Sequence, residues 1–144
     1  MTIRKVFPAI ALLFAFAIMP LVSHADANDQ ATKFTFSEPV QIPGQVLPAG
    51  TYWFQLTDIS NRAIVRVFAA DHVTLVATLS TFRRERPEGN DDVAITLADR
   101  GLGQPEAIVA WFYVGDTDGH EFLYPKQEAR ELAHAMRKTV VTGD

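Results

Sequence analysis

The strongest constraint on the fold is a period of two residues in the middle of the chain. Apolar and polar side chains alternate over residues 51–57 and 73–82, and a run rich in β-branched residues lies between them at 63–69, with short turn-forming stretches separating the three. In the first run Tyr52, Phe54 and Leu56 share one face. This period is that of a strand with one buried face, and short turns join antiparallel neighbours. The segment therefore predicts a three-stranded antiparallel meander.

Shorter strand patterns flank this meander. Residues 33–36 and 40–42 alternate, but the prolines at 39, 43 and 48 restrict them to a sheet edge or to an irregular crossing segment, because proline cannot donate to a ladder. A turn at 47–50 leads into the meander, and 93–98 reads as a further strand. Residues 107–114 are apolar on both faces, with Ile108, Ala110 and Phe112 on one and Val109, Trp111 and Tyr113 on the other. A strand of this kind is covered on both sides, which predicts the central strand.

One helical pattern is present, over residues 126–138. Ala129, Leu132, Ala133 and Met136 recur at helical spacing, and Pro125 suits a first turn. This helix is expected to cover the second face of the central strand. The sequence predicts one mainly β domain over residues 33–144, an antiparallel β-sandwich or open barrel of about six to eight strands with a C-terminal helix. Residues 83–92 and 99–105 are expected to be loops.

The amino end has the three parts of a secretory signal peptide. Arg4 and Lys5 provide positive charge, residues 6–22 are uncharged and mostly apolar, and small residues precede a cut after Ala25 or after Ala27. Residues 1–25 are therefore expected to be a cleaved signal and 26–32 a flexible leader. The alternative is an uncleaved membrane anchor, but the apolar run is short for a span of about 20 residues.

Composition narrows the classes of partner and chemistry. The chain has 13 basic and 17 acidic residues, and a cut after Ala25 removes only basic ones, so the mature protein is acidic. Such a chain has no general attraction for nucleic acid or anionic lipid. It has no cysteine, so disulfides, thiol catalysis and a lipidated cysteine are excluded. We expect an exported protein, periplasmic or extracellular, with no cofactor and no stable membrane span after cleavage.

Residues 115–121 hold the densest group of chemically capable side chains. Asp116, Asp118, His120 and Glu121 lie within six residues, and an imidazole oriented by a carboxylate is a general acid–base pair. The spacing lacks the longer ligand alternation of an EF-hand, and no further histidine has zinc spacing. The simpler interpretation is a hairpin loop whose aspartates and glycines satisfy turn geometry.

Five arginines form a second candidate, an anion-binding patch. They converge if the second and third strands of the meander are neighbours, and they are Arg62, Arg66, Arg83, Arg84 and Arg86. Guanidinium groups bind carboxylate, sulfate or phosphate in bidentate geometry. The alternative is that the nearby acidic residues at 85, 88, 91 and 92 neutralise them in a solvated loop.

Trp53 is the third candidate. It lies on the more polar face of its strand, between Thr51 and Gln55, where an exposed indole can stack on a sugar ring. The alternative is that the indole lies beneath the helix or a second sheet. A carbohydrate-binding module requires the exposed arrangement.

Several segments also resemble a family of small exported bacterial β-rich proteins that are known only as uncharacterised. The likeness rests on LPAGTY at 47–52, AWFYVGD at 110–116 and GHEFLYPK at 119–126, and it covers most of the mature chain. The resemblance implies export and a compact β fold. It implies no activity, ligand or catalytic residue.

These observations leave three functional hypotheses. No Gly-x-Ser-x-Gly motif and no phosphate-binding glycine loop is present in the sequence, which favours a non-enzymatic binding or structural protein of the envelope or extracellular space. The first alternative is a metal-assisted hydrolase or other enzyme that uses the 116–121 loop. The second is a carbohydrate-binding module that uses Trp53.

Overall fold

The computed structural model describes residues 30–57, 64–86 and 92–141. Within them the chain forms ten strands and one helix. In chain order they are β1 (Ala31–Phe36), β2 (Val40–Ile42), β3 (Gln45–Leu47), β4 (Gly50–Leu56), β5 (Ile64–Ala69), β6 (Leu75–Glu85), β7 (Ala94–Ala98), β8 (Glu106–Phe112), β9 (Asp118–Phe122), α1 (Lys126–Ala133) and β10 (Arg137–Val141). The mainly β class with a C-terminal helix is confirmed, although the strands exceed the expected six to eight.

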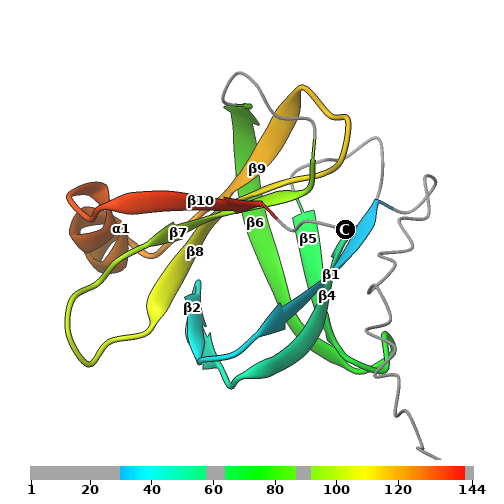
Figure 1. Ribbon diagram of the computed structural model, residues 1–144, viewed down its shortest axis with the longest axis horizontal. Coiled ribbons are helices and arrows are strands. Elements are labelled where there is room, and N and C mark those ends of the chain that lie inside the picture. Colours follow the sequence, from blue (N-terminus) through cyan, green and yellow to red (C-terminus); the bar gives the residue numbers. More distant parts are fainter. Residues whose placement is uncertain (1–29, 58–63, 87–91, 142–144) are drawn as a thin grey trace, which may run out of the picture.

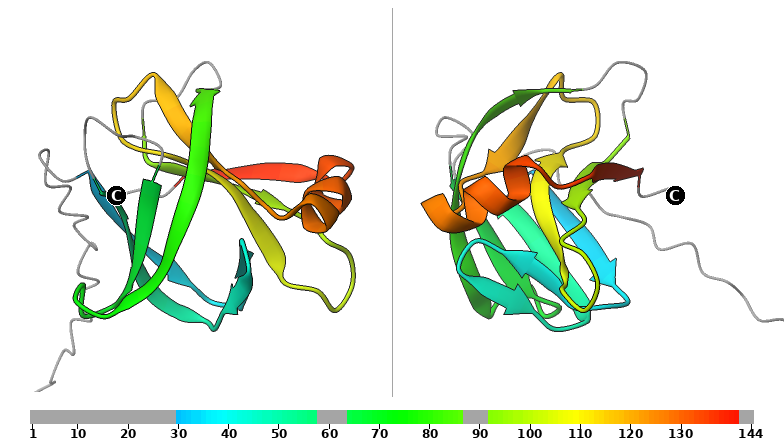
Figure 2. Two further views of the ribbon diagram at one scale, coloured as in Figure 1. Left: turned by 180° about the vertical axis from the view of Figure 1, so that it is seen from behind. Right: turned by 90° about the vertical axis from the view of Figure 1, so that its left-hand side faces the viewer.

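The predicted meander is present as β4, β5 and β6. These strands pair in succession and antiparallel, and β1 adds to the outer edge of β4. β6 then pairs with β9, which joins the meander to the second half of the sheet. The whole sheet curls strongly on itself, as Figures 1 and 2 show from three sides. β1 faces β7 and β10 across an open seam lined by Phe34, Ile95, Leu97 and Val140. The architecture is therefore an open barrel.

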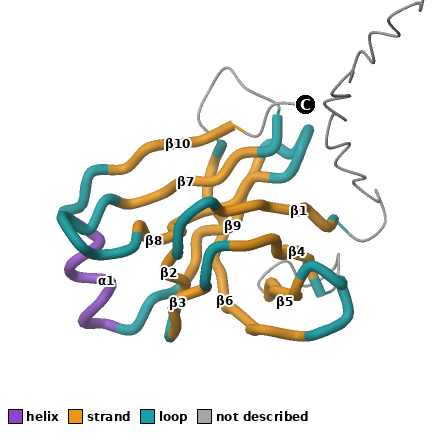
Figure 3. The backbone as a smooth tube through the Cα atoms, turned by 60° about the horizontal axis from the view of Figure 1, so that its bottom comes forward, coloured by secondary structure: helices purple, strands orange, loops and turns teal. Residues whose placement is uncertain are grey.

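β8 is the central strand, as predicted from its apolar faces. It pairs antiparallel with β7 and β9 and parallel with β2, so the sheet is mixed rather than wholly antiparallel. β10 pairs with the outer side of β7. The helix α1 sits at one end of the molecule beside β8 and the start of β10 (Figure 3). Leu132 of α1 packs on Ala98, Ala107 and Val109, which confirms that the helix covers the second face of β8.

The core fills the inside of the curled sheet with aromatic and branched side chains. Phe54 and Trp111 are fully buried, with ring centroids 6.3 Å apart, and Phe122 lies 6.2 Å from Phe54. Each large apolar side chain buried in this way contributes about 1.5–3 kcal/mol of transfer free energy. A cysteine-free chain is stabilised by this burial.

A bulge in β8 overturns the predicted division of its two faces. Thr96 pairs with Ala110 but Leu97 pairs with Ile108, so Val109 is an extra residue in the ladder. A bulge puts two consecutive residues out of strict alternation. Ile108, Trp111 and Tyr113 therefore face the main core, whereas Val109, Ala110 and Phe112 belong to two smaller clusters on the other side.

Three predicted boundaries are wrong. The helix ends at Ala133 rather than 138, because β-branched Thr139 and Val140 lie in a strand that pairs with β7. Residues 83–85, predicted as loop, extend β6 because β9 gives them a partner strand. Ala31 and Thr32, assigned to the leader, are buried in β1. The predicted signal peptide and residues 26–29 lie outside the described residues.

A side-chain hydrogen bond stabilises the turn before β4. Gly50 has a φ of +155°, and the hydroxyl of Tyr52 donates to the carbonyl of Pro48 at 2.7 Å. The structure confirms the predicted turn into the meander, and it adds a hydrogen bond from Tyr52 that the sequence did not predict. In the three ranges given above, no helix has the length and apolar character needed to cross a membrane.

Candidate functional site

His120 lies in β9, and its imidazole is in the core. His120 is 4% exposed, its ring centroid is 5.6 Å from that of Trp111, and its Nδ1 lies 3.4 Å from the hydroxyl of Thr81. His120 pairs in register with Trp111 on one side and Arg83 on the other. The imidazole is thus part of the packed interior of the barrel.

The carboxylate beside it points the other way. Glu121 follows His120 in β9, and successive strand residues point to opposite faces. Glu121 accepts a short hydrogen bond from the Arg84 guanidinium and lies 3.8 Å from that of Arg137. It also lines a groove between β9 and α1, on the outside of the barrel. Glu121 therefore belongs to an ion-pair cluster that joins β6, β9 and β10.

The two aspartates of this segment contact different arginines. Asp118, at the start of β9, forms an ion pair of 2.8 Å with Arg83. Asp116 lies in the turn, where its carbonyl oxygen accepts from Nε of Arg86 at 2.7 Å. The four side chains singled out in this loop do not converge on one cleft. Among the described residues, no three His, Asp or Glu side chains are placed to hold a metal ion.

Arg86, a member of the predicted anion patch, donates to backbone carbonyls of this turn. Besides Asp116 it donates to the carbonyls of Tyr113 and Asp92. Its guanidinium carbon lies 5.5 Å from the centre of the Phe112 ring, a cation–π contact. These donor contacts go to backbone carbonyl oxygens that lie outside the strands. Arg86 therefore stabilises the chain path between β8 and β9.

The predicted arginine patch does not assemble. Arg83 and Arg84 alternate on β6 and pair across the sheet with different acids of β9, Asp118 and Glu121. Arg66 pairs in register with Thr78, five residues before Arg83, which is about 17 Å along the strand. Arg62 lies outside the described residues. The described arginines of this patch therefore have separate partners: Arg83 and Arg84 pair with different acids, and Arg86 contacts backbone carbonyls.

Trp53 lies on the outer face of β4 and is half-buried. The imidazole of His72 stacks on its indole, with centroids 4.4 Å apart and planes 8° from parallel. Lys33 Nζ lies 5.6 Å from the indole centroid, and Phe68 meets His72 edge-on at 5.6 Å. A sugar ring would have to displace the imidazole to stack on this side of Trp53.

The turn between β5 and β6 holds His72 in place. His72 has a φ of +56°, which non-glycine residues rarely adopt, and its Nε2 lies 3.0 Å from Oε1 of Gln55. Asp71 accepts from the amides of Val73 and Thr74 and from the Thr74 hydroxyl. These bonds, that of the Thr74 hydroxyl foremost, lower the pKa of the Asp71 carboxyl to about 2.

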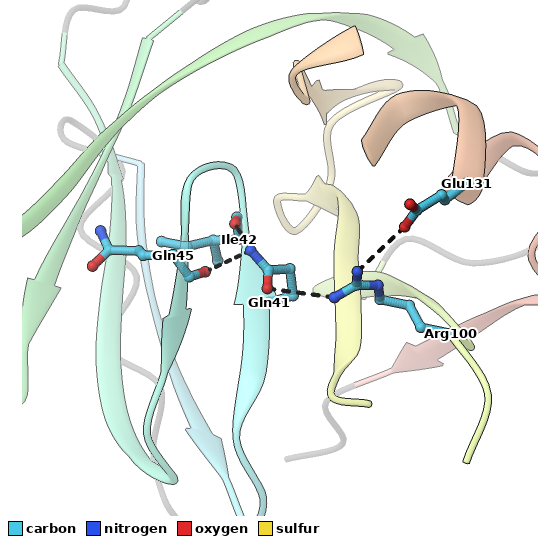
Figure 4. A network of polar contacts seen from close by, with 5 residues as sticks. All are labelled: Gln41, Ile42, Gln45, Arg100 and Glu131. Carbon is cyan, nitrogen blue, oxygen red and sulfur yellow. Dashed lines mark hydrogen bonds and ion pairs between the residues drawn. The ribbon is translucent and has the colours of Figure 1, made fainter. Parts of the chain in front are cut away.

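A polar network that the sequence did not reveal lies at the other end of the barrel (Figure 4). The side-chain amide of Gln41 donates to the carbonyls of Ile42 and Gln45 at 2.6 and 2.9 Å, which turns its oxygen toward Arg100. Arg100 donates to that oxygen at 3.4 Å and to Glu131 of α1 at 3.5 Å. Gln41 is buried, and the Arg100 side chain is 18% exposed.

The loop between β7 and β8 supports this arginine. At its base the amide of Asp99 donates to the carbonyl of Met136, and Asp99 Oδ1 accepts from the amide of Gly101, each at 2.8 Å. Gly101 and Gly103 have φ values of +93° and +78°, a conformation that favours glycine. The glycines predicted a loop here, and their geometry folds it so that Arg100 reaches β2 and α1.

Tyr124 fixes the strand that carries Gln41. Its hydroxyl donates to the carbonyl of Ile108 at 2.7 Å and lies 3.1 Å from that of Gln41. Burial, reinforced by the negative charge of Glu128, raises the pKa of Tyr124, so the phenol stays a donor. Tyr124 therefore holds β2 against β8, and Gln41 of β2 contacts Arg100.

Arg100 borders a cavity of about 360 Å³. Its other lining residues are Asp99, Gln104, Glu131, His134 and Ala135. We name this space the Arg100 pocket. The volume lies within the range of small-molecule sites, and charged groups of both signs surround it. The signal for it was weak in the sequence, because Arg100 is one residue of a glycine loop and its partners lie 59 and 31 positions away.

The chain matches no protein-family model, no curated protein and no solved structure. The geometry of the described residues is therefore the basis for the function proposed below.

Proposed function

We propose that this protein is an exported, non-enzymatic binding domain of the cell envelope or extracellular space, which takes a small polar ligand in the Arg100 pocket. The expectation of export rests on the sequence of residues 1–25. The expectation of binding rests on the pocket.

One observation carries the proposal: the Arg100 guanidinium is largely buried at a cavity wall, yet its contacts are long. Charge-assisted hydrogen bonds between a guanidinium and a carboxylate measure about 2.7–2.9 Å. The contacts of Arg100 with Gln41 and Glu131 are 3.4 and 3.5 Å. A planar group with five donors therefore has capacity left for a ligand at this wall.

Catalysis on the 116–121 loop has less support. General acid–base chemistry needs the acid and the base within reach of one substrate. His120 packs on Trp111 inside the barrel, whereas Glu121 pairs with Arg84 on the outside. Each group has a structural task in a different place, which favours binding over turnover.

The experiment has two arms. In the first, the full chain is expressed with a C-terminal tag in a Gram-negative host, and the intact mass of the protein in each cell fraction is measured. Export predicts a periplasmic or secreted product that lacks residues 1–25 or 1–27. A full-length product in the cytoplasm or inner membrane contradicts export.

In the second arm, the purified product is screened by NMR against amino acids, dicarboxylates, sugars, nucleotides and inorganic phosphate. The proposal predicts saturable shifts of the amides around Arg100 with at least one class, and their loss in Arg100→Leu. A variant control, Arg83→Leu, changes an exposed arginine of β6 and leaves binding intact. If no class shifts those amides in the folded protein, the binding function is refuted.

A further inference from the structure

We propose that the ligand of the Arg100 pocket is a small zwitterion, a free α-amino acid, whose carboxylate binds Arg100 and whose ammonium binds Glu131 on the facing helix. This inference rests on the proposed binding function and adds the chemical class of the ligand. It follows from how the charges are distributed around the cavity.

The pocket has charges of opposite sign on facing elements. Arg100 comes from the loop between β7 and β8, and Glu131 comes from α1 (Figure 4). Asp99 adds a second carboxylate to the lining. A simple anion at Arg100 would lie close to both acids, and a simple cation at the acids would lie close to Arg100. A ligand with both charges a short distance apart matches both sides at once.

The strength of the existing ion pair favours this exchange. Arg100 and Glu131 are 3.5 Å apart, and the Glu131 side chain is 56% exposed. Pairs this long and this solvated contribute little to stability. An α-amino acid replaces one long contact by two shorter charge-assisted contacts, one at each end of the ligand. The free protein therefore loses little when Glu131 turns from Arg100 to an ammonium group.

The polar groups around Arg100 favour a planar carboxylate as its ligand. Gln41 Oε1 contacts Nη1 of Arg100 from β2, and Glu131 contacts Nη2, so Nη2 is the nitrogen that Glu131 leaves to the ligand carboxylate when it turns to the ammonium. Gln104 supplies an uncharged amide to the same lining. A planar guanidinium binds a carboxylate in bidentate form, which lysine cannot reproduce.

The size of the cavity agrees with a ligand of this kind. About 360 Å³ is at the lower end of the range for small-molecule sites. A free amino acid and its first water molecules fill such a space, whereas a folded peptide or an oligosaccharide exceeds it. His134 and Ala135, at the end of α1, form the part of the lining that faces the ligand side chain in this arrangement.

The test uses L-alanine as the probe and two of its derivatives as controls. The exported, processed protein is titrated by NMR and calorimetry with L-alanine, N-acetyl-L-alanine and L-alaninamide. Two charge-assisted contacts predict a Kd near or below about 1 mM for alanine. Each derivative lacks one of the two charges, and each is expected to bind at least about tenfold more weakly.

Variants assign the two ends of the ligand. Arg100→Lys keeps the positive charge but loses bidentate geometry, and it is expected to weaken alanine binding by about tenfold or more. Glu131→Gln removes the acid at an exposed site and is expected to abolish the preference for alanine over N-acetyl-L-alanine. The matched control Arg83→Lys leaves both affinities unchanged.

Two results overturn the inference. The first is a loss of the expected discrimination: equal binding of alanine and its derivatives, or alanine binding of unchanged affinity in Arg100→Lys. The second is Arg100-dependent binding of phosphate, a sugar or a dicarboxylate with no binding of alanine, which leaves the proposed binding function standing. Failure of every class in the screen above refutes the binding function itself, so the two failures are distinct.

Discussion

Gly119 in β9 is the position where one methyl group should do the most damage. A Cβ built there lies 2.3 and 2.5 Å from two carbons of the Phe112 ring and 2.8 Å from the carbonyl oxygen of Trp111. Two of these atoms belong to a ring that is 1% exposed, and the third is backbone. Neither can move without disturbing β8, so Gly119→Ala forces a shift of the central strand against β9.

Overpacking of this kind costs about 1–3 kcal/mol. With a urea m-value of about 2 kcal/mol per M for a domain of this size, the midpoint of unfolding should fall by about 0.5–1.5 M. The assay is urea denaturation followed by tryptophan fluorescence and by circular dichroism. The double variant Gly119→Ala/Phe112→Leu shortens the ring that the methyl group meets. It should unfold at higher urea than the sum of the two single effects predicts.

A midpoint within about 0.2 M of the parent protein would refute this reasoning. That result would mean that the Phe112 ring does not lie over Gly119, and hence that β8 and β9 do not pack at this register. Additive effects in the double variant would locate the cost elsewhere than in the contact between the two residues.

Three further changes test other parts of the structure. Tyr124→Phe removes the donor to the Ile108 carbonyl and should lower the free energy of unfolding by about 1–2 kcal/mol in urea titrations, whereas an unchanged midpoint would contradict the bond. Because the folded pKa of Asp71 is depressed from 3.8 to about 2, its stabilisation is complete above 3.8 and is lost as the pH falls toward 2. Thermal melts should therefore show the parent losing stability relative to Asp71→Asn in that window, and parallel curves would contradict the lowered pKa. His72→Ala uncovers one face of Trp53 and should red-shift its emission and raise acrylamide quenching, while unchanged spectra would refute the stack.

The sequence predicted the parts of the fold that depend on local pattern. Alternation and β-branched residues over 51–82 identified β4, β5 and β6, and apolar side chains on both faces identified β8 as the central strand. Each of these signals is contained within about ten residues of chain. The helix and the turn before β4 were predicted from proline, glycine and helical spacing in the same way.

What the sequence could not predict depends on pairing between distant segments. The bulge at Val109 is set by the register of β8 against β7, and the sequence of β8 alone gives strict alternation. Thr139 and Val140 were predicted to follow the helix, and their place in a strand depends on pairing with β7. Arg83–Glu85 read as a solvated loop until β9 pairs with them.

The candidate site shows the same limit more strongly. Proximity along the chain grouped His120 with Glu121, but a strand sends neighbouring side chains to opposite faces. The Arg100 pocket joins a glycine loop, a short strand and a helix whose residues are far apart in sequence. No local pattern marks such a group, because its chemistry arises from the curl of the sheet.

The most direct test of the account is the NMR signal of the Arg100 guanidinium itself. Arginine Nε–Hε resonances of the processed protein are assigned with Arg100→Lys and followed during titration with L-alanine. The account predicts that the Arg100 resonance shifts saturably, with the same Kd as the backbone amides of residues 99–104, while those of Arg83 and Arg84 stay fixed. An Arg100 resonance that does not move while the protein is folded, across the full titration, would contradict the central claim.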